Sequence, residues 1–402
     1  MRHERSFLYK TPSTLLLLTL MCAGGHPSRA DIIGDANSAF KLQGFVSLVA
    51  GKFYGGDGVP NPSTTTFAQG TKIPCPCFVS NWANAGVYSE NRLTLRPDSI
   101  GGLQADYNFD AKNSFSAQAT SRGSIMTPAV QWFYFAHQIT AHWDVHAGRQ
   151  RIPLFYYSSS QDVGVSYPWV VPPEEVYGYE ATNYNGLSTS YKSSWQGIAS
   201  RLEAYTGFEY IHNSPYTGLI DNWQQTSVRW KNILGSAWTL NKDFWTLHVN
   251  YLTAQVNWSG QPTTFLQRLN AYGAALNMDF DSVFMTSEYG KFIRNNYQVI
   301  GNPFNNSGYT ELEPTYSVTG GARWKSFTPT ITYAKFLDHY TYQQPQSTIP
   351  VFPNGGWKLA LRYDIDDASD VKFQYDTHQD LGEQFYTTGS GKLVRISYDR
   401  VF

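Results

Sequence analysis

Three acidic residues of the stretch 151–183, which interrupts a series of strand-like segments, are candidates for a pore constriction. They are Asp162, Glu174 and Glu175. Basic residues that could face them lie on later segments: Arg201, Arg229, Lys231, Arg323, Lys325, Lys358, Arg362, Lys372 and Arg395. Acids that face bases across a narrow, water-filled space need perform no bond chemistry, because their transverse field alone favours polar solutes over apolar ones. Such a filter requires a hollow fold, in which 151–183 supplies the acids and the wall supplies the bases.

The segments that would form the wall alternate in polarity. In 357–364, Trp357, Leu359 and Leu361 fall on one face of a strand, whereas Lys358 and Arg362 fall on the other. A short polar turn, 366–370, then leads into 371–376, which repeats the same alternation. This pattern predicts an antiparallel hairpin with one face suited to lipid and the other suited to water.

The same pattern recurs along the chain and predicts sixteen strands. They lie near 39–53, 100–110, 113–121, 129–138, 141–150, 184–192, 196–209, 226–240, 243–257, 265–280, 283–294, 312–326, 328–337, 357–366, 370–378 and 391–402. Short turns alternate with longer loops, as in barrels whose turns are periplasmic and whose loops are extracellular. Hydrocarbon offers no partner for a free strand edge, so the last strand must pair with the first. The sequence therefore predicts an all-β fold: a transmembrane antiparallel β-barrel of about sixteen strands, with long extracellular loops and 151–183 folded into the lumen.

The N-terminal segment has the pattern of an export signal. Arg2, Arg5 and Lys10 precede an apolar run that ends before Ser28-Arg29-Ala30, which resembles a signal-peptidase site. We expect residues 1–30 to be removed and 31–402 to form the barrel. Removal takes four of the 30 basic and one of the 31 acidic residues, which leaves 26 against 30. This mild acidity argues against nucleic acid as a partner.

The two ends of the predicted barrel domain carry family resemblances. Tyr398 and the terminal Phe402 share a face and resemble the signal that the barrel-assembly machinery reads on outer-membrane proteins. The stretch 148–155, with Gly148-Arg149, and the stretch 162–178 resemble the segment after the fifth strand in proteobacterial general porins. The resemblance implies passive diffusion of small polar solutes and ions across the outer membrane. It also implies outer-membrane lipid, lipopolysaccharide and the assembly machinery as partners, with a homotrimer as an open possibility and no cofactor.

Other functions stay open at this stage. A channel selective for anions or oligosaccharides would share this pattern, and an adhesive role could use the loops 54–99 and 293–313. A barrel phospholipase would need a serine, a histidine and an asparagine, as in His212-Asn213-Ser214, but such short matches arise by chance and we expect no enzyme. The histidines 137, 142 and 146 favour hydrogen bonding over metal binding, and a Cys75–Cys77 disulfide is left undecided.

Alternation also assigns the remaining candidates to a face. Arg149 and Arg151 share the face of Trp143, which argues against the lumen unless a bulge intervenes or the strand has already left the membrane there. Six aromatic residues are expected to face lipid, some of them in interfacial girdles: Trp132, Trp143, Trp230, Trp245, Trp324 and Tyr398.

Overall fold

The computed structural model describes residues 39–57, 64–66, 72–125, 127–220, 226–259, 264–300, 309–343, 346–350, 353–381 and 388–402. The predicted signal peptide lies outside these residues. Within them, no helix combines the length and the apolar character needed to cross a membrane.

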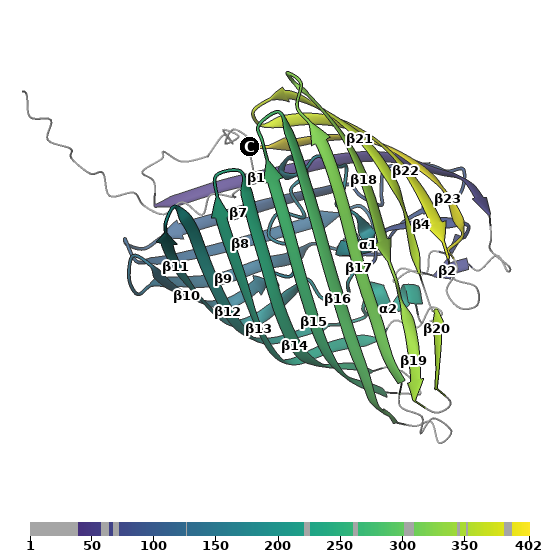
Figure 1. Cartoon of the computed structure of the whole chain (residues 1–402), viewed down its shortest axis with the longest axis horizontal. Helices are drawn as coiled ribbons and strands as arrows, with labels where there is room; N and C mark the ends of the chain where they lie inside the picture. Colours follow the sequence, from purple (N-terminus) through teal and green to yellow (C-terminus); the bar gives the residue numbers. More distant parts are fainter. Residues whose placement is uncertain are drawn as a thin grey trace, which may run out of the picture.

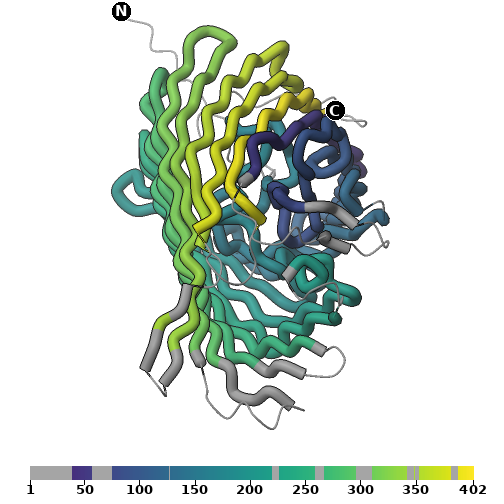
Figure 2. Tube along the Cα trace, turned by 90° about the vertical axis from the view of Figure 1, so that its right-hand side faces the viewer, coloured from purple at the N-terminus to yellow at the C-terminus, as the bar shows by residue number. Residues whose placement is uncertain are grey.

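The described chain forms a closed antiparallel barrel (Figure 1). Sixteen long strands make up its wall: β1 (Phe40–Asp57), β7 (Ile100–Asn108), β8 (Asn113–Arg122), β9 (Ala129–Gln138), β10 (Trp143–Arg151), β11 (Asn183–Trp195), β12 (Ile198–Ile211), β13 (Ser227–Lys242), β14 (Trp245–Ser259), β15 (Thr264–Asp279), β16 (Val283–Ile300), β17 (Tyr309–Ala322), β18 (Phe327–Phe336), β21 (Asn354–Asp366), β22 (Ser369–Asp380) and β23 (Ser390–Val401). The barrel closes where β23 pairs with β1, with Val401 opposite Phe45, and Figure 2 shows these two strands side by side. The predicted sixteen-strand transmembrane barrel is confirmed.

The wall is uneven in height. Strands β7 and β10 have 9 residues each, whereas β15 has 16 and β16 has 18. Tight turns join the strands at one rim, and the residues with positive φ there include Gln196, Asp243, Asp281 and Lys325. By the usual rule this rim is periplasmic, and the opposite rim is extracellular. The extracellular side carries a short hairpin of β19 (His339–Gln343) and β20 (Gln346–Pro350), and helix α2 (Pro215–Ile220).

The outer surface is apolar, as the alternation predicts. Trp357, Leu359 and Leu361 are exposed on β21, while Lys358 between them is buried. Trp143, Trp324 and Tyr398 also lie on the outer face. The predicted lipid contact is wrong for Trp132 and Trp230, since Trp230 is fully buried in the lumen and Trp132 lies under the Arg151 guanidinium.

Register irregularities explain these two errors. On β8 and β9 the pairing shifts between Gln118 and Ala119, and on β13 and β14 it shifts between Lys231 and Leu234. Asn232, inside the second shift, has a φ of 51°. Each bulge moves the residues beyond it to the opposite face of the strand.

Two segments fold into the lumen. One is 152–182, which contains a short 3-10 turn (Gly164–Ser166) and helix α1 (Glu174–Tyr177). The other is the part of 75–99 that contains the hairpin of β4 (Cys77–Asn81) and β5 (Gly86–Ser89), whereas the two-residue β6 (Leu93–Thr94) after it pairs with β1 in the wall. A further short pair joins β2 (Thr64–Thr66) to β3 (Lys72–Pro74). We call 152–182 the inserted loop and 75–99 the inserted hairpin; the predicted folding of 151–183 into the lumen is confirmed.

Apolar packing holds the inserted loop in place. Its side chains Ile152, Leu154, Phe155, Val176 and Tyr179 form one buried cluster with inward residues of β11 to β16. Fully burying an aliphatic or aromatic side chain contributes about 1.5–3 kcal/mol. The wall therefore presents an apolar face to lipid on the outside and, on part of the inside, another apolar face to the loop.

Candidate functional site

Lys358 binds both acids of helix α1. Its Nζ lies 3.0 Å from Glu174 Oε2 and 3.1 Å from Glu175 Oε2. All three side chains are buried. Burial first, and then the nearby Glu174 carboxylate, raise the pKa of Glu175 to about 7. One ammonium group thus balances two carboxyl groups, the second of which takes up a proton near neutral pH.

Arg362 and Lys372 hold the loop around its 3-10 turn. The Arg362 guanidinium donates to the Val165 carbonyl oxygen over 2.7 Å, and Lys372 Nζ donates to the Gly164 carbonyl oxygen over 2.6 Å. Lys372 also pairs with Asp399 at 3.1 Å. These contacts bring two wall bases onto backbone carbonyls of the loop, a role that alternation alone does not specify.

The third loop acid, Asp162, has other partners than the predicted wall bases. Its carboxylate pairs with the guanidinium groups of Arg122 and Arg151. Although burial alone would raise the pKa of Asp162, these two cations outweigh it and hold the pKa below its usual value. The sequence analysis missed Arg122 and ranked Arg151 low. Arg151 reaches the lumen because it is the last residue of β10, where the chain leaves the wall.

Arg395 anchors the inserted hairpin. It pairs with Asp98 at 3.0 Å and with Asp376 on the neighbouring strand at 2.7 Å. Tyr88 of β5 donates to Asp98 as well, over 2.9 Å. The hairpin is therefore fixed to the inner wall near the closure of the barrel.

Five of the nine predicted wall bases lie elsewhere than at the constriction. Arg229 and Lys231 are exposed on the outer face, because the bulge at Asn232 reverses the alternation of β13 above it. The predicted inward placement of these two residues is wrong. It is also wrong for Lys325, which lies in the turn after β17 with its ammonium 5.6 Å from the Trp324 ring centroid.

The other two are inward or at the rim but contact no loop acid. Arg323 pairs with Asp279 at 2.7 Å near the periplasmic turns. Arg201 is 3.1 Å from Glu203 on its own strand. Arg149, ranked low by its face, pairs with Glu209 at 2.7 Å instead of with the loop. The bases that meet Asp162, Glu174 and Glu175 are therefore Lys358, Arg122 and Arg151. A fourth loop acid, Glu180, which the sequence analysis did not single out, pairs with Arg294 of β16 at 2.8 Å.

Several hydrogen bonds also attach the inserted loop to the wall. Glu288 on β16 accepts hydrogen bonds from the Tyr156 backbone N–H over 3.0 Å and from the Tyr177 hydroxyl over 2.8 Å. Trp169 Nε1 donates to Thr332 over 2.8 Å. Glu288 is the sole acid on β16, so the alternation of that strand could have identified it as an inward acid. Its partners in the loop could not be predicted, because they depend on tertiary packing.

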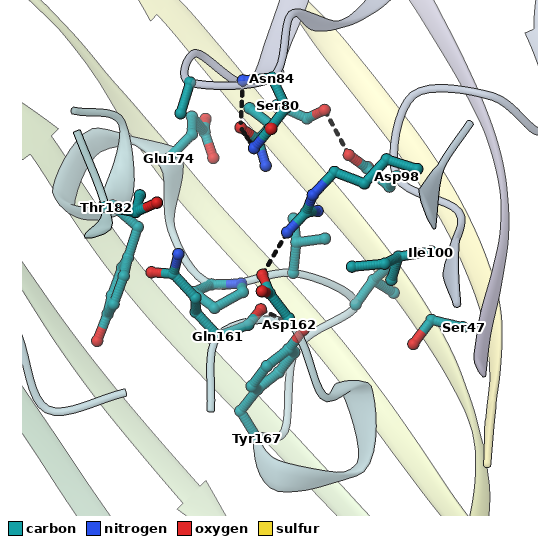
Figure 3. Close-up of a pocket in the computed structure, with 17 residues that line it drawn as sticks. Ser47, Ser80, Asn84, Asp98, Ile100, Gln161, Asp162, Tyr167, Glu174 and Thr182 are labelled. Atoms are coloured by element: carbon teal, nitrogen blue, oxygen red, sulfur yellow. Dashed lines mark hydrogen bonds and ion pairs between the residues drawn. The ribbon is translucent and has the colours of Figure 1, made fainter. Parts of the chain in front are cut away.

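A polar cleft lies where the inserted loop and the inserted hairpin meet (Figure 3). Its volume is about 620 Å³, open mouth included. Ser80 and Asn84 line it from the hairpin, and Gln161, Asp162 and Glu174 line it from the loop. Within the described part of the chain, the buried Gln161 Oε1 and Arg122 Nε have no hydrogen-bond partner. The cleft can therefore offer both acceptors and donors to a small polar solute.

The acids and bases of this site form direct ion pairs. The sequence analysis had expected them to face each other across a water-filled space. Each of Lys358, Asp162 and Arg395 forms two ion pairs within its own cluster. The clusters cross-link the loop and the hairpin to the wall. Their residual field must come from local imbalances, such as the two acids that share Lys358.

The absence of a side chain at Gly164 lets the inserted loop approach the wall closely. A Cβ built on Gly164 would collide with the Asp399 carboxylate and with Ser47 Oγ. We predict that Gly164→Ala lowers the stability of the folded barrel by about 1–3 kcal/mol, because the loop must shift away from the wall. Thermal unfolding followed by gel mobility measures this loss. Gly320→Ala is the matched control, since a Cβ at that position meets no atom within 4 Å, and an equal loss in both variants would contradict the contact.

The histidines have contacts other than those of a catalytic or metal site. His212, considered for catalysis, has its Nδ1 3.2 Å from Ser227 Oγ. His248 Nε2 lies 3.2 Å from the Pro153 carbonyl oxygen. His146 stacks on Tyr134 with a centroid distance of 5.1 Å. In the described ranges no cluster of three or more His, Cys, Asp or Glu residues could hold a metal ion. Cys75 and Cys77 are joined by a disulfide.

The sequence matches no protein-family model and no curated protein sequence. Solved structures do resemble the barrel. In vitro folded OmpT, an outer membrane protein of Vibrio cholerae, is 10% identical with a TM-score of 0.54, over 93% of this chain and 100% of that one. The outer membrane channel DcaP of Acinetobacter baumannii is 10% identical with a TM-score of 0.54, over 90% and 97%. Salmonella typhi OmpF is 10% identical with a TM-score of 0.51, over 90% and 97%.

These likenesses show the fold of an outer-membrane, porin-type β-barrel. Within that class, this chain is a sixteen-stranded barrel whose lumen holds both an inserted loop and an inserted hairpin.

Proposed function

We propose that the protein is a general outer-membrane porin through which small polar solutes and ions diffuse passively. The observation that carries the proposal is the inserted loop, pinned across the lumen by Lys358, Arg362 and Lys372. A segment fixed in this way narrows a barrel too wide for its own side chains to fill. Export, the assembly signal at Tyr398 and Phe402, and trimer formation belong to the same proposal.

The cleft favours a second candidate, a channel selective for hydroxylated solutes such as oligosaccharides. Carboxylate and amide groups line it together with Tyr167 and Tyr177. Such surfaces combine hydrogen bonding with ring contacts. Liposome swelling with sugars and with amino acids of matched size separates the two candidates, because a general porin sorts these solutes by size alone.

Glu174→Gln with Glu175→Gln is expected to shift ion selectivity toward anions. The change removes up to two negative charges and leaves the Lys358 ammonium without a counter-charge in the lumen. The reversal potential across a tenfold salt gradient in a planar bilayer measures the shift. Asp366→Asn is the matched control, because Asp366 lies in a periplasmic turn at the opposite end of β21. Equal reversal potentials in the double variant and the wild type would contradict the proposed constriction.

A further inference from the structure

A second cluster of charged side chains lies inside the barrel, on the extracellular side of the constriction. Arg294 of β16 pairs with Glu180 of the inserted loop through both terminal nitrogens, at 2.8 and 2.9 Å, and its Nε donates to Glu313 of β17 over 2.8 Å. Thr315, two residues further along β17, donates to the Glu175 carbonyl oxygen of helix α1. The cluster is therefore about 7 Å along the strand from helix α1, on the side from which an external solute arrives.

Two further acids adjoin Arg294 without a base of their own. Glu311 is directly opposite Arg294 in the pairing of β16 with β17, so both side chains lie on the inner face. Asp338, between β18 and β19, is only 7% exposed, and its Oδ1 has no hydrogen-bond partner among the described residues. Burial, and next the Glu313 carboxylate, raise the pKa of Asp338 well above its ordinary value, so Asp338 lies beside the cluster. Within the described ranges neither Glu311 nor Asp338 forms an ion pair.

Carboxyl groups are in excess here. On the described inner faces of β15 to β18, Arg294 is the sole base, because Arg268, Lys291 and Lys335 occupy outward positions. The internal segments outside the described residues contain no lysine or arginine. Buried carboxylates without a counter-charge are costly, so they take up protons or a cation from the solution. We call these five residues the Arg294 cluster: Glu180, Arg294, Glu311, Glu313 and Asp338.

The surroundings of the Arg294 cluster suit an organic cation better than a metal ion. The described His, Cys, Asp and Glu residues form no group of three or more that could hold a metal ion. Burial, and next the Glu313 carboxylate, raise the pKa of the Tyr216 hydroxyl in helix α2 well above its ordinary value, so this hydroxyl lies close to the cluster. The Tyr216 ring contacts the rings of Trp82 and Trp258, with centroid distances of 6.3 and 6.2 Å. Carboxylates beside aromatic rings are a combination that binds ammonium and guanidinium groups.

We propose that the Arg294 cluster binds small organic cations that carry guanidinium or primary ammonium groups. The Glu311 carboxylate and the free Asp338 Oδ1 accept hydrogen bonds from the cation, while Glu180 and Glu313 stay paired with Arg294. A solute that enters from outside meets this cluster before it reaches helix α1, so the cluster concentrates cationic solutes at the entrance to the constriction. The binding site rests on the contacts described above, whereas its part in transport rests on the proposed function.

Isothermal titration calorimetry of the whole folded barrel in detergent tests the binding. The first ligand is agmatine, which carries a guanidinium and an ammonium group. In the second, N-carbamoylputrescine, a neutral urea group replaces the guanidinium, and the third is magnesium chloride. The variant is Glu311→Gln with Asp338→Asn, and the control is Asp110→Asn with Asp366→Asn in two periplasmic turns. The variant loses two charge-assisted hydrogen bonds to the ligand, each worth about tenfold, and should bind agmatine on the order of 100-fold more weakly.

The wild type should bind agmatine about tenfold more tightly than N-carbamoylputrescine, and the control should keep its affinity for agmatine within about twofold. If the double variant fails to fold, Asp338→Asn alone should lose about tenfold. Equal binding of the two amines, or unchanged binding in the variant, would overturn the proposal. Full displacement of agmatine by equimolar magnesium would overturn it too, since the site would then be one for a metal ion.

Single-channel recording separates this inference from the proposed function. A wild-type barrel that conducts but binds no agmatine overturns the cation site alone and leaves passive diffusion standing. A barrel that binds agmatine but passes no current overturns passive diffusion and leaves the cation site standing.

Discussion

Lys358→Met is expected to release helix α1 from the wall. The change leaves Glu174 and Glu175 buried without their cation, and breaking a buried ion pair by removing one partner costs about 3–5 kcal/mol. Part of that loss is avoided if both carboxyl groups take up protons. The folded barrel should melt at a lower temperature, and single channels should carry more current because the loop no longer narrows the lumen.

Two further variants make this expectation specific. Adding Glu174→Gln and Glu175→Gln to Lys358→Met removes the unpaired charges and should restore most of the lost stability. Lys112→Met, in an exposed periplasmic turn, controls for the loss of a lysine as such. If Lys358→Met melts and conducts like the wild type, the ion pairs do not hold the loop. The same conclusion follows if the added glutamines make the protein still less stable.

The attachment of the inserted loop is expected to weaken as pH rises toward neutrality and above. The pKa of Glu175 is raised to about 7 from 4.5, first by burial and second by Glu174. A carboxyl group whose pKa is raised in the folded state stabilises that state fully below its unfolded pKa, and this contribution is lost as pH rises through the folded pKa. Between pH 4.5 and pH 7 the folded state therefore binds more protons. The loss of stability over that window is at most about 3.4 kcal/mol.

Thermal unfolding of the barrel at pH 5 and at pH 8 measures this effect. Glu175→Gln should flatten the pH dependence, because the amide cannot titrate, and it should match the wild type at pH 5. Asp110→Asn is a suitable control. The exposed Asp110 carboxylate accepts hydrogen bonds within its turn, and these lower its pKa. Titration of Asp110 therefore changes the stability of the barrel only at lower pH. A Glu175→Gln barrel with the full pH dependence of the wild type would show that another group is responsible.

Alternation in the sequence was sufficient to predict the barrel, because the physics of the wall is local. Lipid on one side and polar groups on the other impose a period of two, so Lys358, Arg362, Lys372 and Arg395 were assigned to the inner face from their neighbours alone. The structure buries all but Arg362, and brings Arg362 to the loop as well. The closure of β23 on β1 follows from the same argument, since a free edge has no partner in hydrocarbon.

The errors arise where the local rule stops. One extra residue near Asn232 reverses the face of Arg229, Lys231 and Trp230, and nothing in the composition of that stretch marks the bulge. Alternation assigns no inward or outward side to a turn residue such as Lys325. The partners of Asp162 depend on how the loop crosses the lumen, which is set by contacts between segments far apart in the chain. The inserted hairpin was missed for the same reason.

Single-channel recording of the refolded barrel in a planar bilayer tests the central proposal most directly. With a salt gradient across the bilayer, the same recording gives both the conductance and the reversal potential that reports ion selectivity. A passive channel narrowed by a pinned loop predicts steady, ohmic current steps in the wild type, larger steps in Lys358→Met, and a reversal potential that moves toward anions when Glu174 and Glu175 become glutamine. A folded, inserted wild-type barrel that passes no current would contradict the account, and would mean that the inserted loop and hairpin seal the lumen instead of narrowing it.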